Sequence, residues 1–230
     1  MRVKRLVTAL GVAVLTVGCS LLVDVPVQAH AAPDNCPPAC DRIPDAAWID
    51  PSAIPLHTTY SWPTLSALAV TATKPRFQFE ELCAKPPPHA DPREYAVAAK
   101  ALVINPPGQW QLQVQVIHWR GDVWLGGQNA DATIAAAAWG LRTCQLSAPA
   151  VSPSVTIDQP GRLAAVISGS AATPVVAHQY LASHPASGTV VELAMWASSP
   201  PLVGWPTVND QQVLDALITP LCTAYIGSCG

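Results

Sequence analysis

The sequence predicts an α+β fold, in which an antiparallel sheet has two or more helices packed on one face and disulfide bonds join parts of the chain. Three observations indicate this: segments with the two-residue period of strands, segments with the helical period, and an even number of cysteines behind an N-terminal apolar run. The chain has 230 residues, of which 50% are hydrophobic and only 12% are charged. This composition suits one domain with a large buried core.

The first 31 residues have the composition of a secretory signal peptide. A basic start precedes an apolar run over residues 6–23, and small residues follow at the expected cleavage point. We expect cleavage after Ala31 and a mature chain that is secreted or associated with the cell wall, without a transmembrane span. Two alternatives would keep the chain at the membrane: an uncleaved signal, or a lipid attached to Cys19.

Prolines are frequent in the segment that follows, which shows little helical or strand periodicity. Because proline cannot donate to a strand ladder or a helix interior, we expect an irregular arm. Four of its aromatic residues would anchor it: Trp48, Trp62, Phe77 and Phe79. The chain is therefore expected to consist of a signal peptide (1–31), a proline-rich arm packed on the domain (32–90) and the α+β domain (91–230).

The clearest strand runs from Trp110 to Trp119. Apolar residues alternate there with three glutamines, which predicts a half-buried strand. Tyr95 to Ile104 is the expected hairpin partner. The sequence from Asp91 to Glu94 also resembles a helix start, with a capping acid followed by proline, so this segment has two interpretations.

The rest of the domain repeats the same pattern of strands and capped helices. After Gly126-Gly127, Asn129 or Asp131 is expected to begin a helix that runs to about Cys144. Asn209-Asp210 is expected to begin the most amphipathic helix of the chain, which ends near Cys222. Two hairpin-like pairs of strands lie between these helices: Val155 to Asp158 with Leu163 to Ser168, and Val175 to Leu181 with Thr189 to Ala197.

Six cysteines follow the expected cleavage point: Cys36, Cys40, Cys83, Cys144, Cys222 and Cys229. An even number in an exported chain predicts three disulfides. Trp119 to Cys144 and Trp196 to Cys222 have similar lengths and similar order, from a strand end through a loop to a helix. If those helices lie side by side on one face of the sheet, Cys144 pairs with Cys222.

Several classes of function lack support in the sequence. The net charge of −3, more negative without the signal peptide, argues against nucleic acid as a partner. The histidines lack metal-ligand spacing and no Cys-x-x-Cys occurs, so we expect no metal site; no phosphate-binding loop is found, and we expect no cofactor.

A serine hydrolase is an alternative that individual residues permit. Its candidate groups would be Ser168 or Ser170, His178 or His184, and Asp158 or Glu192. The Ser168 region lacks the Gly-x-Ser-x-Gly elbow of many hydrolases, so turn serines beside surface histidines are the simpler interpretation.

The tryptophans are the stronger candidates for a binding site. Trp119 and Trp124 bracket a predicted turn, and Trp205 lies in the corresponding loop of the second half. Exposed tryptophan can stack on sugars or line an apolar groove, whereas buried tryptophan fills a core. We take these three residues as candidate ligand-binding residues, with a cell-envelope glycan, lipid or protein as the partner.

The order of elements resembles a known family. A strand, an alanine-rich helix that contains Trp139 and ends at Cys144, later strands and a C-terminal helix with Cys222 resemble the extracytoplasmic sensor domain of actinobacterial PknH-type receptor Ser/Thr kinases and related stand-alone exported proteins. The resemblance covers about residues 95–229. It implies a disulfide-bonded sheet-and-helix domain with a ligand cleft and no catalytic residues. We therefore expect an exported, non-enzymatic binding or sensor-like domain; a serine hydrolase and a structural or host-facing secreted protein are the alternatives.

Overall fold

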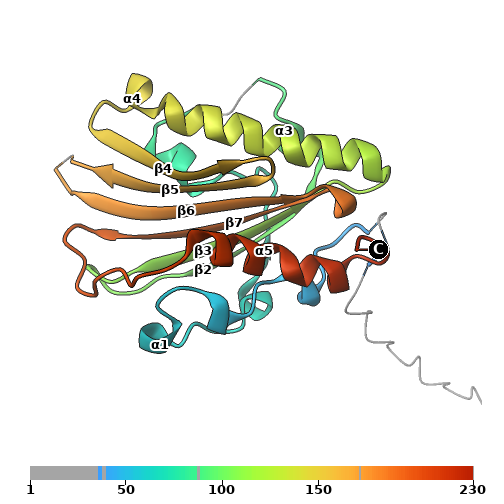
Figure 1. Ribbon diagram of the computed structural model, residues 1–230, viewed down its shortest axis with the longest axis horizontal. Helices are drawn as coiled ribbons and strands as arrows, with labels where there is room; N and C mark the ends of the chain where they lie inside the picture. Colours follow the sequence, from blue (N-terminus) through green and yellow to red (C-terminus); the bar gives the residue numbers. More distant parts are fainter. Residues whose placement is uncertain (1–35, 38–39, 87–88, 171, 230) are drawn as a thin grey trace, which may run out of the picture. The chain divides into compact units, whose positions relative to one another are not determined.

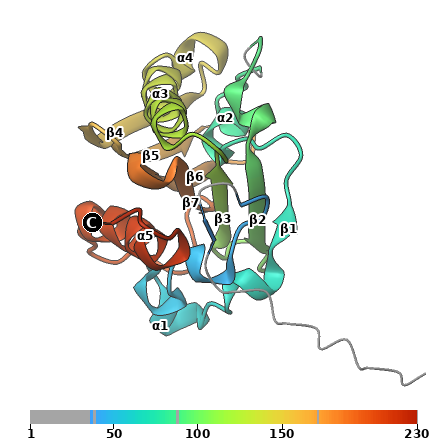
Figure 2. The same cartoon turned by 90° about the vertical axis from the view of Figure 1, so that its right-hand side faces the viewer.

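Seven antiparallel strands form one sheet in the computed structural model, in the order β1-β2-β3-β7-β6-β5-β4 (Figures 1 and 2). The strands are β1 (Val70–Thr71), β2 (Val97–Val103), β3 (Gln111–His118), β4 (Val151–Gln159), β5 (Arg162–Gly169), β6 (Val175–His184) and β7 (Thr189–Ser198). The predicted α+β class, with an antiparallel sheet and disulfides, is confirmed.

The structure describes residues 36–37, 40–86, 89–170 and 172–229. The expected signal peptide, its cleavage site and Cys19 lie outside these residues. The α-helices among them are α1 (His57–Tyr60), α2 (Gln78–Leu82), α3 (Val123–Arg142), α4 (Cys144–Ser147) and α5 (Asp210–Ala224). Short 3-10 helices occur at η1 (Asp45–Ala47), η2 (Pro51–Ala53), η3 (Leu65–Leu68), η4 (Pro92–Tyr95) and η5 (Pro185–Ser187).

The two long helices, α3 and α5, lie on opposite faces of the sheet, and strands pass between them in Figure 2. On one face Leu141 of α3 shares a buried cluster with Leu163 of β5. On the other face Leu217 of α5 shares a second cluster with Tyr180 of β6. Helices α2 and α4 belong to the α3 cluster, so several helices do share one face, as expected.

Three disulfides form, as the cysteine count predicts, and they join Cys36 to Cys40, Cys83 to Cys144 and Cys222 to Cys229. The predicted pairing of Cys144 with Cys222 is wrong. It assumed that α3 and α5 lie side by side, whereas the sheet separates them. Cys144 instead joins the end of α3 to Cys83, which directly follows α2.

Strand β3 is buried on both faces, although its alternating glutamines predict one solvated face. Gln113 and Gln115 are only 4% and 1% exposed. The Gln115 amide donates to the backbone carbonyl of Arg76 in the arm, and the Gln113 amide donates to Glu192 of the neighbouring strand β7. The polar period therefore marks a buried polar layer, which periodicity alone cannot distinguish from a solvated face.

Helix α3 begins earlier than predicted, at Val123, because the side chain of Asp122 accepts the N–H of Leu125 and caps it. Gly126 and Gly127, expected in a loop, form its second turn. A Cβ on Gly127 would stand 2.8 Å from the carbonyl oxygen of Pro185, so glycine allows the helix to approach η5 closely. Tertiary packing thus outweighs the weak helical propensity of two glycines.

Both interpretations of residues 91–104 are partly correct. Asp91 caps the short helix η4 by accepting the N–H of Arg93, and strand β2 follows directly and pairs with β3. The predicted start of the last helix is also observed, since the Asn209 side chain accepts the N–H of Gln211 at the start of α5.

The arm passes around one edge of the sheet. Trp48 and Trp62 are buried in the cluster on the α5 face, whereas Phe77 and Phe79 are buried in the cluster on the α3 face. Between them the two-residue strand β1 pairs with β2. Strand β4 forms the opposite edge, where Pro153 interrupts the donors of the ladder and the register shifts between Val155 and Ile157.

Candidate ligand groove beside helix α3

A groove of about 440 Å³ lies between helix α3 and the residues 77–86 and 91–93. Helix α3 lines it with Ala132, Ala136 and Gly140, which are spaced by four residues and share one side of the helix. Gly140 lets the ring of Phe79 approach, because a Cβ there would lie 3.1 Å from the Phe79 ring. Small side chains on the helix thus leave the space, and the opposite segment supplies an aromatic and proline wall.

Trp139 lines the same groove and is 67% exposed. A large apolar ring left in water beside an apolar groove is able to cover a bound molecule. The spacing of residues on α3 places Trp139 next to Gly140 and one turn from Ala136. Trp139 is therefore the exposed aromatic residue that this groove offers to a ligand.

A buried charge cluster supports the wall of the groove opposite α3. The guanidinium of Arg93 forms a two-bond pair with Glu80, at 2.8 Å for each bond, and also binds Asp91. Its charge lies 4.8 Å from the centre of the Phe77 ring. Burial by itself would lower the pKa of Arg93, but the hydrogen bonds of both carboxylates outweigh burial and raise it. The cluster is fully paired and fixes η4 against α2.

A third buried carboxylate fixes the start of α2 to the sheet. Glu192 of β7 accepts the N–H of Gln78 at 2.6 Å and the amides of Gln113 and Gln179 at 2.9 and 3.0 Å. Burial raises the pKa of Glu192 to about 7, although these hydrogen bonds lower it. The polar layer on strands β3, β6 and β7 therefore positions the segment that forms the groove wall.

Lys85 completes this wall. Its ammonium donates to the carbonyl and the hydroxyl of Thr143, at 2.9 and 3.0 Å, at the C-terminal end of α3. A cation is favoured at that end of a helix, where carbonyl groups lack partners. Together with the Cys83–Cys144 disulfide, this contact joins both sides of the groove at one end.

The structure places the three candidate tryptophans apart. Trp119 is buried, and its indole N–H donates at 3.0 Å to the carbonyl of Pro92, a residue of the groove wall. Trp124 is exposed near the start of α3. Trp205 packs with the α5-face cluster and stacks on His178 with ring centres 3.5 Å apart. They form no common site, and Trp119 alone touches the groove wall.

The residues considered for a serine hydrolase have other partners. Ser170 donates to a backbone carbonyl, His178 stacks on an indole, and His184 contacts a different serine. Glu192 is buried beneath α2, as described above. The carbonyl that Ser170 meets belongs to Ala150, and the indole against His178 is that of Trp205. The serine beside His184 is Ser187, and Asp158 pairs with Arg142. Ser168 stands in the β5–β6 ladder opposite Val176. The described residues do not bring these groups together as a triad.

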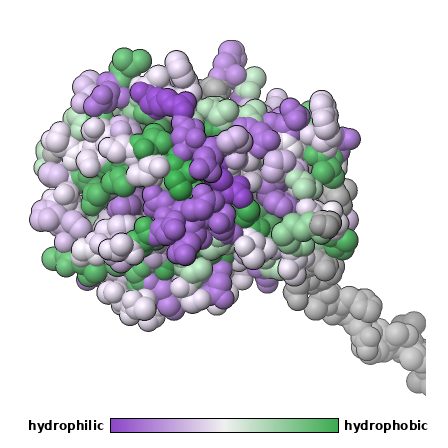
Figure 3. Space-filling view, viewed as in Figure 1, coloured by the Kyte–Doolittle hydropathy of each residue, from purple (hydrophilic) through white to green (hydrophobic). Residues whose placement is uncertain are grey.

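The face between α3 and α5 has a different character. Hydrophilic side chains gather near its middle in Figure 3. Ion pairs join Arg142 to Asp158 and Arg162 to Asp215 there, and the Gln211 amide donates to Asp215. Arg162 also donates to the backbone carbonyls of Gly161 and Ser183. Charged groups thus occupy this side of the molecule, in contrast to the mainly apolar groove.

Sequence reasoning missed the groove because its two sides are distant in the chain. The available signal was the small-residue repeat of Ala132, Ala136 and Gly140, which lies beside the apolar stripe that identifies the helix.

No helix among the described residues has the length and apolar character needed to span a membrane. No protein-family model, curated protein or solved structure matches this chain.

Proposed function

We propose that this chain is an exported, non-enzymatic binding domain of the cell envelope, and that the groove beside α3 binds the apolar chain of an envelope lipid. The observation that carries the proposal is the groove itself: about 440 Å³, lined by small, aromatic and proline side chains with one exposed tryptophan at its edge. Ligand pockets typically have this size and this mainly apolar lining.

The charges of the groove favour an apolar ligand. The Arg93 guanidinium is paired with the carboxylates of both Glu80 and Asp91, and the Lys85 ammonium donates to Thr143, so their hydrogen-bonding groups are already occupied. A ligand would therefore gain little from these groups, whereas each buried methylene contributes about 0.8 kcal/mol. This favours a lipid chain over a glycan, which needs many hydrogen-bond partners.

Export is supported by the signal-like segment 1–31 and by the three disulfides, which form and persist in oxidising compartments. A sensor-like role would agree with the resemblance to PknH-type extracytoplasmic domains. The protein would act at the cell wall, in the envelope or in the medium.

The test uses a dibrominated fatty acid, since bromine on the chain quenches tryptophan at short range. We expect saturable quenching of tryptophan fluorescence in the native chain, and Trp139→Phe should lose most of this quenching. Ala136→Leu fills the groove and should abolish quenching. Ala135→Leu makes the same change at the neighbouring exposed position, which does not line the groove, and should leave quenching intact.

Two outcomes would contradict binding in the groove. One is equal quenching in the native chain, Ala136→Leu and Ala135→Leu. The other is quenching of the native chain that begins only at concentrations where the fatty acid forms micelles. Labelling of Ser168 or Ser170 by a fluorophosphonate would favour the serine hydrolase instead. Both variants should keep the near-ultraviolet circular dichroism of the native chain, so that loss of binding is not loss of folding.

A further inference from the structure

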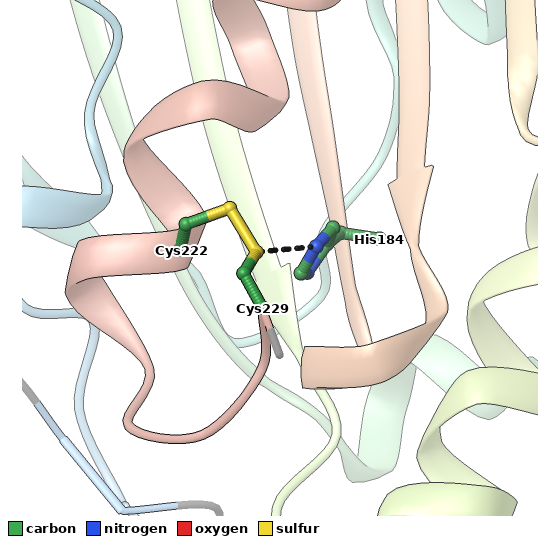
Figure 4. A group of neighbouring side chains, drawn as sticks. All are labelled: His184, Cys222 and Cys229. Atoms are coloured by element: carbon green, nitrogen blue, oxygen red, sulfur yellow. Dashed lines mark hydrogen bonds between the residues drawn. A yellow bond between two sulfur atoms is a disulfide. The ribbon is translucent and has the colours of Figure 1, made fainter.

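A histidine and a disulfide meet at the far end of the molecule from the Cys83–Cys144 bond. The Nε2 atom of His184, at the end of β6, lies 3.4 Å from the Sγ atom of Cys229, which is bonded to Cys222 near the end of α5 (Figure 4). Ligand atoms from all three side chains lie within 4.8 Å of one another. Sequence spacing could not show this group, because His184 is distant in the chain from both cysteines.

The imidazole of His184 is oriented by Ser187. The Ser187 hydroxyl lies 2.8 Å from Nδ1 and donates to the backbone carbonyl of His184 at 3.2 Å. Because a hydroxyl has one proton, its oxygen accepts the proton of Nδ1, and we assign the lone pair to Nε2. That lone pair is directed at the Cys229 sulfur. Metal-binding histidines are oriented in the same way, by a partner on the other ring nitrogen.

We propose that reduction of the Cys222–Cys229 disulfide creates a binding site for a thiophilic cation such as Zn²⁺, with His184 as the third ligand. An external dithiol supplies two electrons, breaks the S–S bond and becomes a disulfide itself, leaving two cysteine thiols. The cation then displaces both thiol protons and binds two thiolates and the neutral imidazole nitrogen. Water at the exposed site supplies a fourth ligand.

The geometry fits this cation with a small movement. Tetrahedral zinc, with bonds of about 2.1 Å to nitrogen and about 2.3 Å to sulfur, separates nitrogen and sulfur ligands by about 3.6 Å. The observed separation of His184 Nε2 and Cys229 Sγ is 3.4 Å. The Cys222 and Cys229 sulfurs must separate, from a bond to about 3.8 Å. The Cys222 sulfur lies within 4.8 Å of the imidazole and must come to about 3.6 Å from Nε2, and both cysteines are exposed.

The site would form selectively. Cys83 and Cys144 are fully buried, and in the third disulfide Cys36 is buried and Cys40 half-buried, whereas Cys222 and Cys229 are both exposed. An external thiol therefore reaches the Cys222–Cys229 bond most readily. The site is separate from the ligand groove, so this proposal does not depend on the proposed lipid binding.

The test measures Zn²⁺ on the full exported chain before and after mild reduction. Alkylation and peptide mass spectrometry first establish that Cys222 and Cys229 alone are reduced. We expect about one Zn²⁺ per reduced chain, none on the oxidised chain, and release of two protons per ion. Substituting Cd²⁺ for Zn²⁺ should give the ultraviolet charge-transfer absorption of metal–thiolate bonds, a readout of sulfur ligation.

Matched variants identify the third ligand. Ser187→Ala should weaken Zn²⁺ binding about tenfold through loss of orientation, and His184→Ala should weaken it further while the disulfide still forms. His89→Ala removes an exposed histidine elsewhere and should change nothing. The proposal is overturned if the reduced chain binds no Zn²⁺ although both thiols alkylate, or if His184→Ala binds as tightly as the native chain.

Discussion

Glu192 Oε1 accepts the backbone N–H of Gln78 at 2.6 Å, so a single buried carboxylate fixes the start of α2 to the central strand β7. The same oxygen also accepts the amide of Gln179. Because α2 belongs to the groove wall, the protonation state of this carboxylate bears on the groove as well as on stability.

Burial raises the pKa of Glu192 to about 7 from 4.5, so the folded chain binds a proton that the unfolded chain loses. The stabilising effect is complete below about pH 4.5 and is lost as the pH rises through about 7, a total of about 3 kcal/mol. Glu192→Gln is uncharged and should not show this loss. We expect the native chain to lose about 3 kcal/mol relative to Glu192→Gln between pH 4.5 and 8, measured by urea unfolding.

The prediction concerns the difference in unfolding free energy between the native chain and Glu192→Gln, because His178 makes stability depend on pH in the opposite direction. Burial lowers the pKa of His178 to about 4, so its contribution increases as the pH rises from about 4 to 6.5. Both chains contain His178, and its effect cancels in the difference. Parallel stability curves for the native chain and Glu192→Gln would contradict the prediction.

The buried charge cluster makes Arg93 essential for stability. Arg93→Leu leaves the carboxylates of Glu80 and Asp91 buried without their cation, and we expect a loss of about 3–5 kcal/mol in urea unfolding. Arg142→Leu is the control, since Arg142 pairs with Asp158 at the surface, where the two side chains are 52% and 36% exposed. It should cost about 1 kcal/mol or less, and equal losses would show that the buried pairing is unimportant.

The close approach of α3 and η5 predicts an unusual response to alanine. Gly127→Ala should destabilise the protein by about 1–3 kcal/mol, although alanine favours helices, because its Cβ would lie 2.8 Å from the Pro185 carbonyl. Gly204→Ala is the matched control, since a Cβ there meets nothing within 4 Å. Thermal unfolding of the two variants should differ by several degrees, and a stabilised Gly127→Ala would refute the packing argument.

The intact mass of the protein from its native host, alkylated without reduction, tests the proposed export and maturation. We expect a chain that begins at Ala32 with no alkylated cysteine, because six cysteines form three disulfides. A lipid on Cys19 or an uncleaved N-terminus would establish membrane anchoring in place of release.

Local patterns predicted most elements of the fold, and tertiary contacts explain most of the errors. The alternation of residues along β3 and the helix cap at Asn209 involve residues that are adjacent in the sequence, so both could be predicted from it. The early start of α3 follows from the local cap at Asp122. The packing of Gly127 against Pro185 and the pairing of Cys83 with Cys144 depend instead on which face of the sheet α3 occupies. Neither is encoded in a short stretch of sequence.

The candidate site was less predictable than the fold. A groove requires two segments to stay apart, and composition shows only what each segment contains. The sequence predicted exposed tryptophans as the ligand-binding residues, whereas the space beside α3 is left by small residues such as Ala136 and Gly140. The meeting of His184 with Cys229 likewise depends on how β6 and α5 cross.

The arrangement of the two sheet edges affects how copies of this protein behave when crowded. Unpaired strand edges invite another chain to add its own strand, which leads to aggregation. Here one edge is the two-residue strand β1, and the other carries Pro153 and a register shift at Val155. Both described edges are poor templates for another strand, so a chain with few charged residues can remain dispersed at high concentration.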